Sequence, residues 1–284
     1  MFKNISFLFV SLAALCLVSC SKNDTAPAAA SDPAANLQKI NSFVLSGTSV
    51  RADVYRQFDS LFVGYNPLYF KLTDTASGQL VSNASIAVNP TMNMGTMMHG
   101  CPIDQPAYVD SLRLYKSGIS FVMSTAAATT MNMSGANLGW TLPVAITLNG
   151  NTYEDTLSVT VKDIAANKIF IHSFSGSDGS AYYLALVRPW QSGQAVGMND
   201  LEVAVYKQIS DFGFQAANGL TITFEPTMPS MGHSSPNNIN PVSIGNGHYQ
   251  GKVNLTMTGD WQLAFTVMQG NTTLASDVDI DISF

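Results

Sequence analysis

The sequence is poor in charge. Only 11% of its 284 residues are charged, and acidic residues outnumber basic ones to give a formal net charge of −6. A basic nucleic-acid-binding protein is excluded, because such a chain could not neutralise a row of phosphates. The 46% of hydrophobic residues argues equally against a disordered protein. We therefore expect a folded protein with no nucleic-acid partner.

Long apolar runs are also scarce. The run near the N-terminus extends from Ile5 to Val18 and is shorter than the roughly 20 residues that a spanning helix needs. It ends in Leu17-Val18-Ser19-Cys20, which resembles the lipobox of bacterial lipoproteins. The resemblance implies a lipoprotein signal peptide over residues 1–19 and a lipid on Cys20. An ordinary signal peptide with an incidental cysteine is the alternative.

Three cysteines are too few for a disulfide framework. Cys16 is removed with the predicted signal peptide and Cys20 carries the lipid, so Cys101 is the only free thiol. An aspartate directly after the lipidated cysteine would resemble an inner-membrane retention signal, but here Ser21 and Lys22 follow Cys20. We expect a lipid-anchored protein of the cell envelope, with the outer membrane favoured, that faces the periplasm or the exterior.

What the chain does contain is an internal duplication. Residues 63–91 and 196–227 both begin with Val-Gly-x-Asn, continue through two alternating strands separated by a polar turn, and end in Pro-Thr before a methionine. Trp140 and Trp261 begin matching strands later in each copy. Short alternating strands between polar turns predict an all-β fold. We expect two tandem immunoglobulin-like antiparallel β-sandwiches, over 41–165 and 166–284, after a lipidated Cys and flexible linker at 20–40.

The strand pattern is explicit enough to assign faces and turns. Leu68, Phe70 and Leu72 alternate with other residues and should share one buried face. Asn149-Gly150 and Gly270-Asn271 are typical of tight hairpin turns.

Each copy then carries a loop rich in soft ligands. The first loop contains four methionines within residues 92–98, followed by a histidine and a cysteine, and the second contains Met228, Met231 and His233. Thioether, thiolate and imidazole groups are donors that Cu(I) prefers over harder ions. The candidate metal ligands are Met94, Met97, Met98, His99, Cys101, Met228, Met231 and His233. Cys101 would act as a thiolate that tightens the first site and makes it redox-sensitive.

Other methionines and one further histidine lie within reach of these loops. Met123, Met131 or Met133 could complete the first site, and His248 and Met257 could supplement the second. The competing interpretation is that the methionines fill gaps beneath the loops. Convergence of sulfurs and ring nitrogens on one point would favour metal, whereas methionines buried singly would favour packing.

The order of these motifs resembles the YtkA-like and FixH-like domains. The second copy matches better, with its loop from Met228 to His233 followed by Gly247-His248-Tyr249-Gln250-Gly251 and by Met257-Thr258-Gly259-Asp260-Trp261. The first copy departs by an insertion around residues 124–137 and by Cys101. The resemblance implies immunoglobulin-like sandwiches and an association with copper handling and respiratory oxidase assembly.

Nothing in the sequence indicates an enzyme. None of the four histidines lies in a hydrolase or zinc-protease motif, and no glycine-rich phosphate loop is present. The acids, Asp104 among them, are scattered and are explained by capping and solubility. We predict a membrane-anchored protein that binds Cu(I) and exchanges it with a copper donor or acceptor in the envelope. The alternative is a metal-free binding or adhesion module that engages an envelope protein or glycan.

Overall fold

The computed structural model describes residues 31–130, 138–189 and 193–283. Residues Pro33–Phe284 belong to one compact unit. The predicted signal peptide at 1–19, the predicted lipidation site Cys20, Met131 and Met133 lie outside the described residues. Within those residues, no helix combines the length and the apolar character needed to cross a membrane.

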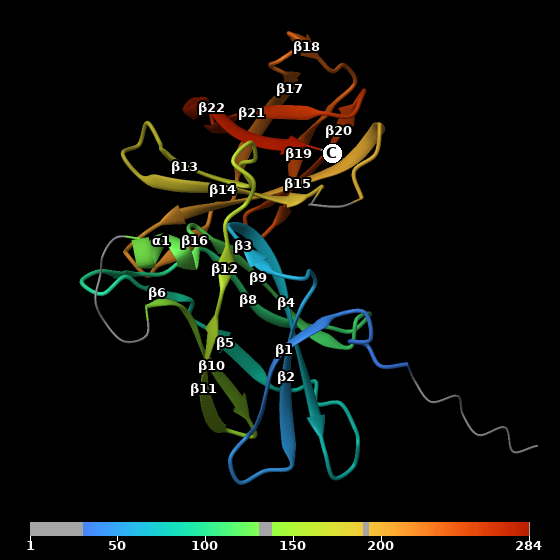
Figure 1. Cartoon of the computed structure of the whole chain (residues 1–284), viewed down its shortest axis with the longest axis vertical. Helices are drawn as coiled ribbons and strands as arrows, with labels where there is room; N and C mark the ends of the chain where they lie inside the picture. The colour runs from blue at the N-terminus through green and yellow to red at the C-terminus, as the bar shows by residue number, and fades with distance from the viewer. Residues whose placement is uncertain (1–30, 131–137, 190–192, 284) are drawn as a thin grey trace, which may run out of the picture. The chain divides into compact units, whose positions relative to one another are not determined.

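The first sandwich consists of two antiparallel sheets (Figure 1). The order in one sheet is β1-β2-β4-β9-β8, with bounds Gln38–Val44, Val50–Arg56, Gly64–Asp74, Leu114–Phe121 and Ile103–Val109. The order in the other is β11-β10-β6-β7, with bounds Asn151–Val159, Gly139–Leu148, Thr91–Asn93 and Met98–His99, and β5 (Ser85–Val88) also pairs with β10. A short parallel pair joins β3 (Leu61–Phe62) to β12 (Val161–Lys162), and α1 (Thr125–Thr130) precedes β10. Strand β1 starts inside the range predicted as linker.

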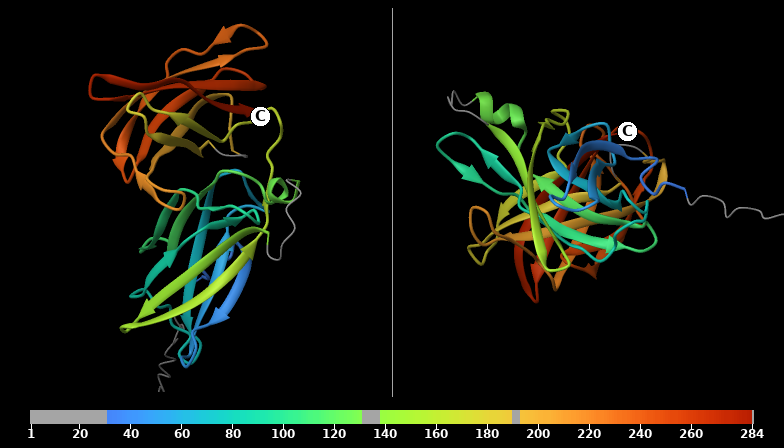
Figure 2. Two further views of the ribbon diagram at one scale, coloured as in Figure 1. Left: turned by 90° about the vertical axis from the view of Figure 1, so that its left-hand side faces the viewer. Right: turned by 90° about the horizontal axis from the view of Figure 1, so that it is seen from below.

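The second sandwich repeats this two-sheet plan. One sheet has the order β13-β14-β15-β20-β19, with bounds Ile171–Ser175, Ala181–Arg188, Gly197–Gln208, His248–Leu255 and Ile239–Gly245, and β16 (Phe214–Ala216) pairs with β15. The other has the order β18-β17-β21-β22, with bounds His233–Ser234, Leu220–Met228, Asp260–Gln269 and Thr272–Ser283. The all-β class and the antiparallel sandwiches are confirmed, and Figure 2 shows the layered strands from two further directions.

Each sandwich has a hydrophobic core between its two sheets, and Phe62 of β3 extends from the first sandwich into the core of the second, where its ring meets that of Phe170. Leu68, Phe70 and Leu72 of β4 are all buried, as their alternation predicts. Trp140 and Trp261 are among the largest fully buried side chains, and each lies in the core of its own sandwich. Burial of such side chains supplies the main favourable term in folding.

The Val-Gly-x-Asn motif of each copy has a structural purpose. Asn66 accepts a hydrogen bond from the backbone N–H of Phe62 and donates to the carbonyl oxygens of Phe62 and Gly64. Asn199 makes the same three contacts in the second copy, with Ala195 and Gly197. The glycines have φ of +120° and +111°, which residues with a Cβ rarely adopt. The motif therefore closes the loop that enters the central strand β4 or β15.

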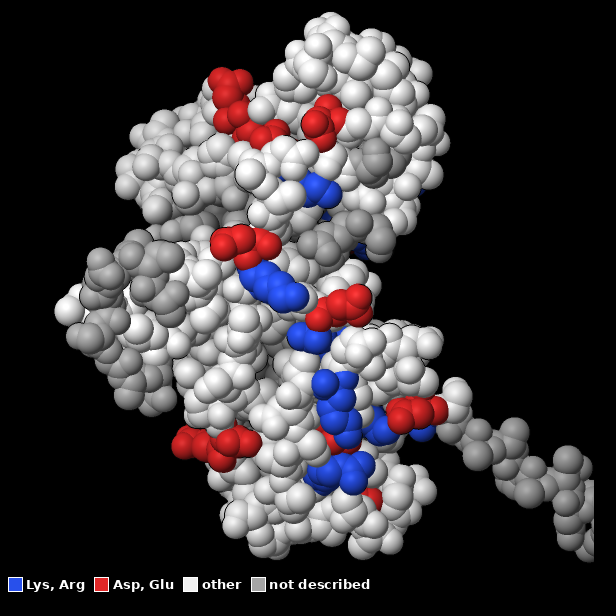
Figure 3. Space-filling model, in the orientation of Figure 1, with Lys and Arg blue, Asp and Glu red and all other residues white. Residues whose placement is uncertain are grey.

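The predicted hairpin turns are also present. Asn149 and Gly150 have φ of +52° and +81° and join β10 to β11. Gly270 has φ of +58° and lies between β21 and β22. On the face drawn in Figure 3, charged side chains are few and scattered among uncharged ones, in agreement with the composition.

Candidate metal-binding hairpins

The first methionine-rich loop folds into a hairpin between β6 and β7. The backbone N–H of Met94 donates to the carbonyl oxygen of Met97 at 2.9 Å, and Gly95 has φ of +89° at the turn. The pairing of β6 with β7 places Met92 opposite His99. His99 therefore lies at the end of the short strand β7, and its cross-strand neighbour Met92 is buried in the sandwich core.

The His99 ring is held from two sides. Its Nδ1 lies 2.8 Å from the carbonyl oxygen of Gly100, which can only accept, so Nδ1 carries the hydrogen. Its Nε2 lies 3.2 Å from the sulfur of Met123. The ring meets that of Trp140 edge to face, with centroids 5.5 Å apart. A nitrogen and a thioether thus converge beside an indole ring.

Trp140 also fixes the position of Met123. Its indole N–H donates to the backbone carbonyl oxygen of Met123 at 2.9 Å. Because Trp140 is buried in the core, the backbone of Met123 is tied to a rigid part of the sandwich.

The remaining predicted ligands of the first loop separate into two groups. Met94 and Cys101 are buried in the core, with 5% and 2% of their surface exposed. Met97 and Met98 are exposed to 57% and 47%. Burial raises the pKa of the Cys101 thiol well above its usual range, so that the thiol stays protonated and is a poor metal ligand. The structure brings His99 and Met123 together and leaves Met94 and Cys101 in the packing.

The second hairpin has the same framework. Met228 of β17 pairs with His233 of β18, as Met92 pairs with His99. The His233 ring faces that of Trp261 at 6.3 Å between centroids, and the indole N–H of Trp261 donates to the backbone carbonyl oxygen of Met257 at 3.0 Å. Each sandwich therefore has a histidine, a cross-strand methionine, a tryptophan and a methionine bound through its backbone to that tryptophan.

The two hairpins differ in how far their donors converge. His233 is exposed, and its Nε2 lies 3.2 Å from the hydroxyl of Thr256 instead of a sulfur. Met228 is buried and Met231 is 62% exposed. Across the described residues, no three His, Cys, Asp or Glu side chains gather as a metal site would require. Any site at these hairpins must therefore use thioethers.

Two sequence-based interpretations were wrong. His248 does not supplement the second hairpin, because its ring nitrogens contact Asp104 and Glu202, 2.9 Å and 2.8 Å away. Asp104 is not a surface residue of a turn but a member of β8 that accepts hydrogen bonds from the other sandwich. Asp104 and His248 are 144 positions apart, and no local pattern pointed to the contact.

Comparison with known protein families finds a match within the second sandwich. Residues 182–266 match the model of the YtkA-like family, as the motifs of that copy predicted. The second sandwich is therefore similar to the YtkA-like family over these residues. No curated protein matches the chain.

Similar solved structures are distant. The FdeC adhesin of Escherichia coli has 16% identity and a TM-score of 0.26, over 85% of this chain and 66% of that one. InvD of Yersinia pseudotuberculosis has 14% identity and a TM-score of 0.23, over 88% of this chain and 57% of that one. A conserved domain protein from Bacillus anthracis has 10% identity and a TM-score of 0.31, over 87% and 91%. Similarity at this level identifies neither a partner nor an activity.

Proposed function

We propose that the chain binds Cu(I) as cargo at its two hairpins and exchanges it with a donor or acceptor in the cell envelope. The observation that supports this most is the recurrence of one arrangement. In both sandwiches a histidine lies opposite a methionine and faces a tryptophan ring, and a second methionine is bound to that tryptophan. The histidine and the tryptophan keep their places in both copies although the loops from Met92 to His99 and from Met228 to His233 differ in length and sequence.

The first hairpin fits a soft cation in its present geometry. With Nδ1 protonated, the neutral His99 ring directs the Nε2 lone pair at the Met123 sulfur, which is itself an acceptor. Two acceptors 3.2 Å apart gain nothing from each other, but an ion at about 2.0–2.3 Å from each would satisfy both. Imidazole with thioether favours Cu(I) over magnesium or calcium, which prefer oxygen.

The exposed methionines would serve transfer of the ion. Met97 and Met98 lie at the rim of the first hairpin, and Met231 lies at the rim of the second. A thioether on the surface can enter the coordination of an ion while a partner's ligand leaves. The proposed role is ligand exchange and needs no catalytic group. The predicted lipid on Cys20 would keep the protein at the membrane, with the outer membrane favoured.

The test is a competition titration of the reduced protein with Cu(I) against a chromophoric chelator, with Zn(II) in parallel. We expect tight binding of one or two Cu(I) and little Zn(II). His99→Gln and Met123→Leu should each weaken the first site at least tenfold. Met94→Leu makes the same change at a methionine buried in the core and should leave the affinity unchanged. Equal affinity of all four proteins would refute the assignment of the ligands.

A metal-free binding module is the second candidate, and the exposure of Met97, Met98 and Met231 favours it. Flexible thioether side chains on a surface form adaptable apolar contacts with a protein partner. Failure of the unmodified protein to compete for Cu(I) would select this function. The next experiment would then compare binding to envelope proteins and glycans before and after Met97→Gln and Met231→Gln.

A further inference from the structure

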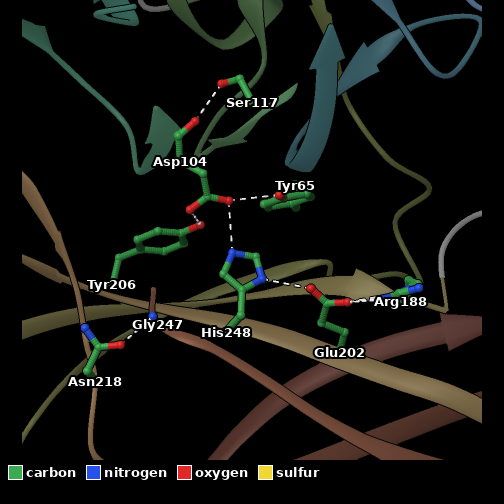
Figure 4. Close-up of polar contacts among 9 residues, drawn as sticks. All are labelled: Tyr65, Asp104, Ser117, Arg188, Glu202, Tyr206, Asn218, Gly247 and His248. Carbon is green, nitrogen blue, oxygen red and sulfur yellow. Dashed lines mark hydrogen bonds and ion pairs between the residues drawn. The ribbon is translucent and has the colours of Figure 1, made fainter. Parts of the chain in front are cut away.

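The contact between the two sandwiches contains a cluster of charged groups that the copper proposal does not use. His248 lies between two carboxylates, and each belongs to a different sandwich (Figure 4). Its Nε2 is 2.9 Å from Asp104 of β8, and its Nδ1 is 2.8 Å from Glu202 of β15. Because both neighbours accept, the imidazole must donate from both nitrogens and is therefore positively charged.

The carboxylates have further donors that hold them in place. The hydroxyls of Tyr206 and Tyr65 donate to Asp104 at 2.8 Å and 2.9 Å, and Tyr206 comes from the second sandwich. Arg188 donates to Glu202 through Nε at 2.9 Å and also through a terminal nitrogen. Each carboxylate therefore accepts hydrogen bonds from His248 and from a further hydroxyl or charged donor.

The backbone around the cluster is built to present these groups. The hydroxyl of Ser117 donates to the carbonyl oxygen of Asp104 at 2.7 Å and so fixes β8 to β9. Gly118 leaves room for Tyr65, since a Cβ there would lie 2.0 Å from the Tyr65 hydroxyl oxygen. In the other sandwich, Asn218 accepts from the N–H of Gly247, which has φ of +74° and precedes His248. These are contacts of a preorganised interface.

The charge state of the cluster follows from its surroundings. Burial opposes protonation of His248, but the hydrogen bonds and charges of Asp104 and Glu202 outweigh it and raise its pKa to about 9. Burial likewise opposes ionisation of Glu202, but donation from His248 and Arg188 outweighs it and lowers its pKa. A cavity of about 550 Å³ beside the cluster gives the ring access to solvent, and Lys116 of β9 is the other charged group in its lining.

We propose that the His248 imidazolium is a latch that holds the two sandwiches in one orientation, and that loss of its proton releases them. A neutral ring can donate to only one of its two neighbours. The other carboxylate would then face a lone pair across a largely buried gap. Among the described residues, Arg188 is the remaining cation paired with the cluster. Opening the interface lets water solvate both carboxylates. The latch does not depend on whether copper binds.

A second contact between the two sandwiches lies next to the first hairpin. The N–H of Gly100, next to His99, donates to the backbone carbonyl oxygen of Asp211 at 2.8 Å, and a Cβ on Gly100 would lie 3.2 Å from the backbone of Phe212. Asp211 and Phe212 belong to the loop between β15 and β16 of the second sandwich. Release of the latch would therefore also free the first hairpin from its neighbour.

The experiment follows the tumbling of the two sandwiches by ¹⁵N relaxation of the whole chain, with histidine side-chain resonances as a record of protonation. At pH 7 we expect one rotational correlation time for both sandwiches and a doubly protonated His248. Above about pH 10 the His248 resonance should report the neutral ring, and the two sandwiches should acquire separate, shorter correlation times. Tyr65 and Tyr206 stay protonated there, since burial raises their pKa values well above 10.

His248→Gln should show the separate correlation times already at pH 7. In the absence of copper, His233→Gln, at an exposed histidine remote from the interface cluster, should keep the single correlation time of the unmodified protein. If His248→Gln does not fold, the pH titration of the unmodified protein decides. A single correlation time with a neutral His248 ring, or a His248 that loses its proton near pH 6.5, overturns the proposal.

Discussion

Replacement of His248 by glutamine should remove a pH-dependent part of the stability. The pKa of the ring rises from an ordinary value of about 6.5 in the unfolded chain to about 9 in the folded one. Each unit corresponds to about 1.4 kcal/mol, so the protonated ring stabilises the folded state by about 3 kcal/mol. This is a large share of the roughly 5–15 kcal/mol by which domains are usually stable.

The sign of the effect is fixed by the direction of the shift. A raised pKa means that the folded state binds the proton more tightly than the unfolded state. The stabilisation is therefore complete below about pH 6.5 and is lost as the pH rises through 9. Glu202 has the opposite pH dependence. Its lowered pKa gives stability that is present above its ordinary pKa of 4.5 and is lost as the pH falls. The two contributions together should make the protein most stable between about pH 4.5 and 6.5.

Urea denaturation at pH 6, 7.5, 9 and 10.5, monitored by tryptophan fluorescence, measures this dependence. The free energy of unfolding of the unmodified protein should fall by about 3 kcal/mol more than that of His248→Gln between pH 6 and 10.5. His233→Gln serves as the control for loss of a histidine at the surface. Parallel curves for the unmodified protein and His248→Gln would refute the reasoning, because the proton on His248 would then contribute nothing to folding.

Three further outcomes follow from burial and close contact. Gly118→Ala should destabilise the protein by about 1–3 kcal/mol in thermal denaturation, and by at least as much as Tyr65→Phe, because its Cβ displaces the whole ring of Tyr65. A smaller loss than for Tyr65→Phe would contradict the close contact. Met228→Ala should cost about 2–5 kcal/mol in urea denaturation, whereas Met231→Ala should change stability by less than about 0.5 kcal/mol. Equal losses would show that burial does not distinguish these methionines. Cys101 should react with a disulfide reagent only after unfolding, and rapid reaction of the native protein would contradict its burial.

The parts of the fold that local pattern controls could be predicted from the sequence. Alternation in β4 identified the buried face, and Asn149-Gly150 identified a turn, because strand faces and tight turns depend on neighbours in sequence. The match of residues 182–266 to the YtkA-like family was likewise visible in the motifs of the second copy. Methionine burial could not be predicted in this way, since Met94 and Met97 lie in the same turn between β6 and β7, and yet Met94 is buried and Met97 is exposed.

The contact between the sandwiches could not be predicted from local sequence pattern either, and the cause is different. Asp104 and His248 meet only because two separately folded sheets come together. A lone aspartate in a polar strand has no signal that distinguishes an interface from a solvated surface. For the contact of Met123 with His99, the sequence indicates only that Met123 is one of three methionines that could approach the loop.

Comparison of equivalent positions in the two copies explains why one repeat carries the latch. Tyr115 and Tyr249 occupy matching positions, and each hydroxyl accepts a backbone N–H, from Ala84 in the first copy and from Leu220 in the second. The residue before the tyrosine is Leu114 in the first copy and His248 in the second.

Leu114 packs with Ala34, Tyr55 and Tyr69 in a small apolar cluster, so the N-terminal segment covers this face of the first sandwich. In the second copy the first sandwich covers the same face, through Asp104. An apolar contact binds regardless of pH, whereas a contact through His248 requires a proton. Divergence at one position of a duplicated frame thus gives the second copy a proton-dependent contact where the first copy has an apolar one. His248→Leu would place the apolar side chain of the first copy at the latch and should abolish its pH dependence.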